Sequence, residues 1–302
     1  MANDNPMSIF DLGIKDIDSY NEGKKETVLY KPTADEGKDS VYRSLIRFLP
    51  NPRNPRKSII RKFVYWLKDS AGNFGLYDAP HTIGDKDPVQ DKFFKLRNST
   101  SAVDKKMSDD LKRREVYYSL VQIIKDPHNP ELDGKVKIFK YGQKLKLKID
   151  EELTPQFEEP TQVFDLFEGK NFELTITKAF GFNNYDSCKF QGKKSPIQIN
   201  GENVENTESG RKLIMDLLAD APKIEDFDFK PWDDATTKKV ADILASYGSP
   251  GRAINTIKTE KEDINVDTEL DNIHMSINND EDAGSEDSEK NDMNEFLADL
   301  DL

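Results

Sequence analysis

Residues 112–149 read KRREVYYSLVQIIKDPHNPELDGKVKIFKYGQKLKLKI. This segment predicts an apolar strand from Ser119 to Ile124, a proline-rich loop, and a second strand from Lys135 to Gly142. Apolar residues alternate again over residues 143–153, which favours a third strand slightly over a helix. The middle of the chain is therefore predicted to form antiparallel sheet.

The same segment is basic and aromatic. It holds ten Lys or Arg residues and only four Asp or Glu residues, with tyrosines and a phenylalanine among the cations. Proteins that hold single-stranded nucleic acid use cations to follow the phosphates and ring faces to stack the bases. The segment therefore predicts a surface for single-stranded nucleic acid.

The net charge of -13 is unevenly distributed. Residues 260–302 hold 16 acidic residues and two lysines, a net charge of -14, so residues 1–259 carry about +1. The last dozen residues place Met293, Phe296, Leu297 and Leu300 on one face of a possible helix. A near-neutral body with an acidic, disordered tail (252–302) is expected, and the tail ends in a docking peptide for a partner.

Composition narrows the class of protein. No apolar run approaches the roughly 20 residues that span a bilayer, and the amino terminus does not resemble a signal peptide. One cysteine, Cys188, excludes an intrachain disulfide and a multi-thiolate metal site. No Walker loop, nucleophile elbow or HExxH motif occurs. We expect a soluble, intracellular protein that is not an enzyme and has no membrane partner.

Periodicity and turn residues predict the other elements. The expected strands are 28–32, 40–49, 59–67, 73–77 and 171–180, and the expected helices are 87–97, 104–114, 208–219 and 234–247. The class is α+β, mainly antiparallel β, and an OB-fold-like barrel elaborated with helices is the expected architecture. An N-terminal arm (1–25) would precede a core (26–251) whose helical subdomain lies near 80–115.

Several motifs point to a family. They are LIRFLP at 45–50, IKDP at 124–127 with DGKV at 133–136, FKYG at 139–142, and GFNNYDSCKF at 181–190. In this order and spacing they resemble the single-stranded DNA-binding, helix-destabilising proteins of T-even-type bacteriophages. The resemblance covers roughly residues 40–190, and the acidic tail matches as well.

The resemblance implies an OB-fold cleft lined with aromatic and basic side chains that binds single-stranded DNA without sequence specificity. It further implies roles in viral DNA replication, recombination and repair in the cytoplasm of the infected bacterial host. Replication and recombination proteins would bind the tail. The aromatic residues at matching positions are Tyr117, Tyr118, Phe139, Tyr141, Phe182 and Tyr185; the cations are Arg47, Lys112, Arg113, Arg114, Lys137, Lys140, Lys144 and Lys146.

Core packing is the competing interpretation for each ring. Tyr117 and Tyr118 are neighbours on a strand and point to opposite faces, so one of them is expected in the core. Phe182 and Tyr185 lie in a polar turn, where large rings are less expected for packing, and they are the stronger candidates.

The chain departs from the family at its zinc site, which uses one His and three Cys. Asp87 and Gln90 stand where a Cys-x-x-Cys pair is expected, and His81 is the nearest remaining candidate ligand. Because structural zinc usually takes four Cys or His ligands, we expect no zinc and no other cofactor. Val89, Phe93 and Phe94 would fill the space instead.

The arm also differs from the family. It lacks the basic motif used for cooperative binding and has only scattered lysines, Lys15, Lys24 and Lys25. Self-association along DNA is thus an open expectation, which Ile9, Phe10 and Ile14 could mediate. The alternatives to single-stranded DNA binding are an RNA-binding translational regulator, a carboxylate and metal-dependent nuclease, and a scaffold that acts through its tail.

Overall fold

The computed structural model describes residues 28–34, 40–69, 71–179 and 182–247. The predicted N-terminal arm and acidic tail, with the docking residues Met293, Phe296, Leu297 and Leu300, lie outside the described residues. So does the side chain of Phe182, although its backbone belongs to a strand.

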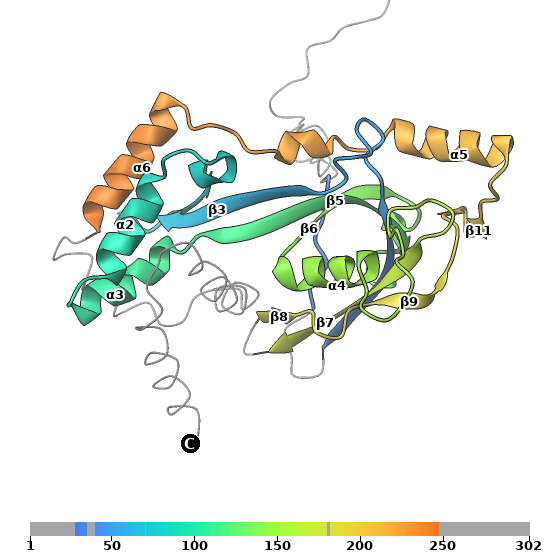
Figure 1. Cartoon of the computed structure of the whole chain (residues 1–302), viewed down its shortest axis with the longest axis horizontal. Helices are drawn as coiled ribbons and strands as arrows, with labels where there is room; N and C mark the ends of the chain where they lie inside the picture. Colours follow the sequence, from blue (N-terminus) through green and yellow to red (C-terminus); the bar gives the residue numbers. More distant parts are fainter. Residues whose placement is uncertain (1–27, 35–39, 70, 180–181, 248–302) are drawn as a thin grey trace, which may run out of the picture.

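One nine-stranded sheet forms the centre of the molecule (Figure 1). Its strands are β1 (Leu29–Tyr30), β2 (Val41–Leu49), β3 (Ile60–Lys68), β4 (Phe74–Asp78), β5 (Arg114–Lys125), β6 (Val136–Tyr141), β7 (Lys170–Ala179), β8 (Phe182–Asn184) and β9 (Lys189–Lys194). A separate hairpin joins β10 (Gln198–Ile199) and β11 (Glu202–Asn203).

The long strand β5 organises the sheet. Along one edge it pairs with β6, and its other edge is divided between β3 at residues 114–118 and β2 at residues 120–125. All pairings are antiparallel except that of β1 with β6. Because β2 continues onward to β7, the sheet curls into a half-barrel (Figure 1). The predicted α+β class with mainly antiparallel sheet is confirmed; the closed OB-type barrel stays an expectation.

Five α-helices occur among the described residues: α2 (Pro88–Arg97), α3 (Ala102–Ser108), α4 (Gln143–Leu153), α5 (Glu208–Ala219) and α6 (Asp234–Ser246). Figure 1 shows α2, α3 and α6 gathered at one end of β3 and β5, while α4 and α5 lie toward the other end. None of the described helices is long and apolar enough to cross a membrane.

The helical end has its own apolar cluster. Tyr65 and Leu67 of β3 pack there with Val89 and Leu96 of α2 and Val240 of α6. The helical region expected near 80–115 thus recruits α6 from far along the chain, where Lys92 Nζ also donates to the Tyr247 carbonyl at 2.8 Å.

Residues 143–153 form a helix, so the predicted strand is wrong. Leu145 and Ile149 are buried and Leu147 is exposed. Positions 145 and 149 are four residues apart and share a helix face, so the same three apolar residues fit either period. The helix segregates the exposed Leu147 and the lysines from the core.

The helix expected at 104–114 begins and ends earlier. Ser101 Oγ accepts the Asp104 amide hydrogen bond and caps α3, which therefore starts at Ala102. The segment from Arg114 onward is already part of β5, where Arg114 lies opposite Val64 of β3.

Candidate nucleic-acid interface

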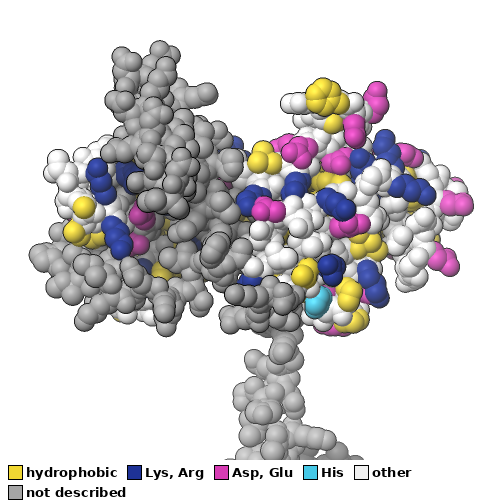
Figure 2. Space-filling model, turned by 90° about the horizontal axis from the view of Figure 1, so that it is seen from below, with side chains coloured by type: hydrophobic (Ala, Val, Ile, Leu, Met, Phe, Trp, Pro, Cys, Tyr) yellow, Lys and Arg dark blue, Asp and Glu magenta, His cyan; other side chains and the backbone are white. Residues whose placement is uncertain are grey.

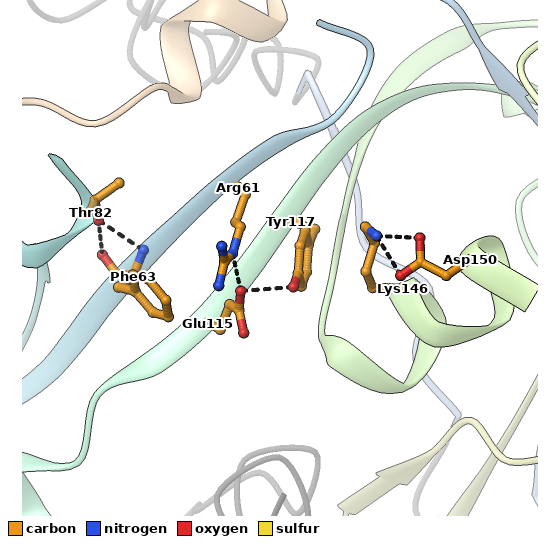
Figure 3. A network of polar contacts seen from close by, with 7 residues as sticks. All are labelled: Arg61, Phe63, Thr82, Glu115, Tyr117, Lys146 and Asp150. Carbon is orange, nitrogen blue, oxygen red and sulfur yellow. Dashed lines mark hydrogen bonds and ion pairs between the residues drawn. The ribbon is translucent and has the colours of Figure 1, made fainter. Parts of the chain in front are cut away.

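Two paired strands present charged and aromatic side chains on one face. Arg61 of β3 lies opposite Tyr117 of β5, and Phe63 lies opposite Glu115. Directly paired residues share a face, and Figure 3 shows these side chains along the same side of the two strands. We call this surface the β3–β5 strip; it consists of Arg61, Phe63, Arg113, Glu115, Tyr117 and Lys146.

Glu115 connects the middle of the strip. Its Oε1 accepts a hydrogen bond from the Tyr117 hydroxyl at 2.8 Å and pairs with Arg61 Nε (Figure 3). Burial, and then the bond to Glu115, raises the pKa of Tyr117, so the hydroxyl stays protonated and donates. The Glu115 side chain is only 7% exposed, whereas that of Arg61 is 60% exposed. The carboxylate therefore anchors a guanidinium that still reaches solvent.

Two guanidinium groups lie against the ring of Phe63. Arg61 Cζ lies 5.0 Å from the centroid of the ring, and Arg113 Cζ lies 4.3 Å from it. Arg113 Nη1 also donates to Gln90 Oε1 of α2 at 2.8 Å, which links the strip to the helical end. A ring with two cations beside it combines the two groups that single-stranded nucleic acid requires.

Helix α4 adds further cations. Lys146 Nζ lies 5.7 Å from the Tyr117 ring centroid and bonds Asp150 Oδ1 at 2.5 Å. Lys144 Nζ bonds Asp186 Oδ1 at 2.9 Å, next to Tyr185 in the loop after β8. On the described surface seen in Figure 2, Lys and Arg side chains lie among Asp and Glu side chains. A phosphate at Arg61, Lys144 or Lys146 therefore competes with the carboxylate that each side chain already contacts.

The predicted aromatic residues on β5 and β6 are buried. Tyr117, Phe139 and Tyr141 are 6%, 2% and 4% exposed, and Tyr141 stacks against both of the others. Tyr118 faces the other side of the sheet and packs against Phe227. Both tyrosines of the pair are thus buried, not one. Their role as stacking platforms stays a prediction, and it requires these ring contacts to open.

The loop after β8 gives a more accessible ring. Tyr185 is half-buried, packs against the core, and its hydroxyl accepts from Asn183 Nδ2 at 3.4 Å. Because it lies next to Asp186, the partner of Lys144, a ring and a cation again lie close together.

Arg47 does not reach the surface. It is 0% exposed, Nη2 donates to the Asp165 carbonyl at 2.6 Å, and Nη1 donates to Asn171 Oδ1 at 3.3 Å. Burial lowers its pKa to about 10. The guanidinium cannot touch a phosphate in this structure, which corrects the expectation for Arg47.

The remaining predicted cations are scattered. Lys112 pairs with Asp109 at 3.2 Å, beside the helical end. Lys137 is buried. Arg114 and Lys140 lie on the face opposite the strip, because their strand partners are Val64 and Tyr118. The structure therefore places Arg113, Lys144 and Lys146 together at or beside the strip and separates the others from it.

The expected zinc region does not fit a metal. Asp87 Oδ1 accepts the Val89 and Gln90 amides at 3.0 and 3.2 Å, and Oδ2 accepts the Tyr65 hydroxyl at 2.9 Å. No group of three or more His, Cys, Asp or Glu side chains in the described part of the chain could hold a metal ion. Val89 is buried as predicted, Phe93 packs on the helical cluster, and Phe94 is 49% exposed instead of filling space.

The sequence interpretation missed Arg61, Phe63 and Glu115. The predicted strand 59–67 contained a usable signal, since Arg61-Lys62-Phe63 places cations beside a ring as the central segment does. The contact between Arg61 and Glu115 depends on the pairing of β3 with β5, which composition does not reveal.

Comparisons with known proteins identify the family. A family model described as "gp32 DNA binding protein like" matches residues 41–233, which include the whole strip. The single-stranded DNA-binding protein of Enterobacteria phage T2 is 26% identical over 219 residues, covering 71% of this chain and 70% of that protein. That of Enterobacteria phage T4 is 27% identical over 199 residues, covering 65% and 64%.

Proposed function

This chain belongs to the gp32 DNA binding protein like family, and from that premise we propose that it binds single-stranded DNA with little sequence preference. The observation that carries the proposal is the β3–β5 strip, where Arg61 and Arg113 lie against Phe63. Cations and ring faces contact parts that every nucleotide shares. Binding would therefore tolerate any base sequence.

The wider role is part of the same proposal. The protein would protect single strands during viral DNA replication, recombination and repair in the cytoplasm of the infected bacterial host. Replication and recombination proteins would bind the tail peptide that contains Met293 and Phe296. It would need no cofactor, and the curled sheet would serve as an OB-type platform.

Titration with single-stranded poly-pyrimidine oligonucleotides tests the proposal. Intrinsic fluorescence of Trp66, Trp232 and the tyrosines should be quenched on binding. The logarithm of the association constant should fall with the logarithm of salt concentration by about 0.7 for each phosphate neutralised. The Arg61→Gln variant should lose about one such increment. Lys189→Gln is the matched control, because Lys189 is 72% exposed on β9 and should leave the slope unchanged.

Two further measurements separate the alternatives. RNA of the same sequence bound more tightly than DNA would favour a translational regulator. Loss of single-stranded DNA on incubation with a divalent metal would favour a nuclease. If the protein binds no oligonucleotide at low salt, the proposal is wrong. A scaffold that acts through its tail would then be the remaining interpretation.

A further inference from the structure

A second group of cations lies on the opposite face of the sheet. On β5, Arg113 lies at the strip, and the next residue, Arg114, is on the other side, opposite Val64. Lys140 of β6 is opposite Tyr118, on that same outer face. Lys31 follows Tyr30, whose partner is Phe139, and so lies beside Lys140. We call Lys31, Arg114 and Lys140 the outer cation cluster.

These cations lack the carboxylate partners that Arg61 and Lys146 have in the strip and that Lys144 has beside it. Arg61, Lys144 and Lys146 each contact a carboxylate. Within the described ranges, no carboxylate lies within ion-pair distance of any member of the outer cation cluster; the neighbouring Lys62 is neutralised by Asp78 at 2.8 Å. Among the described residues, the cluster thus carries positive charge without a carboxylate partner.

The surroundings make this charge unfavourable. Burial lowers the pKa of Arg114. Lys140 reaches solvent, yet desolvation, and then the charges of Arg114, Lys62 and Lys31, lower its pKa. A partly desolvated cation without a partner is costly. An anion placed here would relieve that cost without displacing a carboxylate, unlike an anion at Arg61 or Lys146 of the strip.

We propose that the outer cation cluster is a second binding site, which takes the phosphate groups of a nucleic-acid strand. Arg114 supplies a planar fork of donors suited to phosphate, and the two lysines supply point charges. Tyr118, the ring that the sheet register places opposite Lys140, is 3% exposed and packs against Phe227. With that ring covered, the site reads only the backbone, so it favours duplex DNA, which carries one charge per about 1.7 Å of helix axis, over single strands.

The site goes beyond the proposed function because it would hold a second DNA segment while the strip holds a first. The test uses the full chain saturated with unlabelled oligo-dT, to which a short fluorescent duplex is then added at low salt and followed by anisotropy. The wild type should bind the duplex. The double variant Arg114→Gln/Lys140→Gln should weaken duplex binding roughly tenfold. It should lower the duplex salt slope by about 1.8, since each phosphate contact on duplex contributes about 0.9. Oligo-dT affinity should change less than about twofold.

The controls address folding and location. Lys31→Gln removes only an exposed side chain and should weaken duplex binding in the same direction, by one slope increment of about 0.9. Lys189→Gln/Lys193→Gln removes two exposed cations of β9 and should have no effect. The thermal unfolding midpoint of each variant shows whether it is folded.

Three results would overturn the second site. Duplex binding could be unchanged in both the double variant and Lys31→Gln. Oligo-dT binding could fall together with duplex binding, which would assign these residues to the first site. Duplex binding could appear only after residues 260–302 are removed, which would mean that an acidic peptide fills the face. If the wild type binds duplex but not oligo-dT, the second site stands and the proposed function fails.

Discussion

Arg47 is a cation that the fold uses internally. It lies on β2 between Ile46 and Phe48, which are both fully buried. Its Nη2 reaches the Asp165 carbonyl because Gly169 leaves room, since a Cβ at Gly169 would come within 2.6 Å of that oxygen. The guanidinium therefore ties β2 to the loop before β7 and is withheld from DNA.

The Arg47→Gln variant should lower stability without changing DNA binding. It leaves the partly buried Asp165 carbonyl without its donor, which should reduce the free energy of unfolding by roughly 1–3 kcal/mol. Denaturant unfolding measures this loss, and the oligonucleotide salt slope should match that of the wild type. Arg43→Gln, which removes an exposed arginine from the same strand, should leave stability unchanged. A reduced salt slope for folded Arg47→Gln would return Arg47 to the binding surface.

At the scale of elements, hydrogen bonds fix the start of α2. Asp87 caps its first turn through two amide hydrogen bonds, and the Tyr65 hydroxyl of β3 donates to the second carboxylate oxygen. Burial, and then Asp87, raises the pKa of Tyr65, which keeps that proton in place. Gln90 bonds Arg113, so both positions where cysteines were expected are engaged by hydrogen bonds.

We therefore predict that the helical end is stable to chelators. Treatment with EDTA should leave the thermal unfolding midpoint unchanged, and purified protein should hold no stoichiometric zinc. Asp87→Ala should destabilise by roughly 0.5–2 kcal/mol, the usual loss for an N-cap, and Tyr65→Phe by about 1 kcal/mol. Asp91→Asn, an exposed first-turn change on α2, serves as the control. A midpoint that falls on chelation would contradict the metal-free interpretation.

Most elements were predictable because their signals are local. Asp87-Pro88 marks the start of α2, and the strand predicted at 40–49 matches β2 within one residue. Helix α4 could not be predicted in the same way. Leu145, Leu147 and Ile149 would share a face in a strand, whereas Leu145 and Ile149 share a face in a helix, and only packing decides between the two. Only part of the strip could be predicted from the sequence, because the contact between Arg61 and Glu115 joins residues 54 positions apart. Strand order, not composition, brings these two side chains together.

At the scale of the whole molecule, the charges fall into two opposed parts. Residues 1–259 carry about +1 and residues 260–302 carry -14. Within the body, the strip cations are already partly neutralised by Glu115, Asp150 and Asp186. The body thus has modest cationic attraction for DNA, and we expect a tethered polyanion at high effective concentration to compete with DNA for it.

Truncation after residue 255 should tighten single-stranded DNA binding at low salt. The gain should shrink toward zero as salt rises, because the Debye length falls from about 30 Å at 0.01 M to about 3 Å at 1 M. Fluorescence titration of full-length and truncated protein over a salt series measures this. A full-length variant with its tail Asp and Glu residues changed to Asn and Gln is the matched control, and it should behave like the truncated protein if charge is the cause. Equal affinities of all three proteins at every salt concentration would show that the tail does not compete for the body, and an effect of truncation alone would assign it to the apolar docking residues.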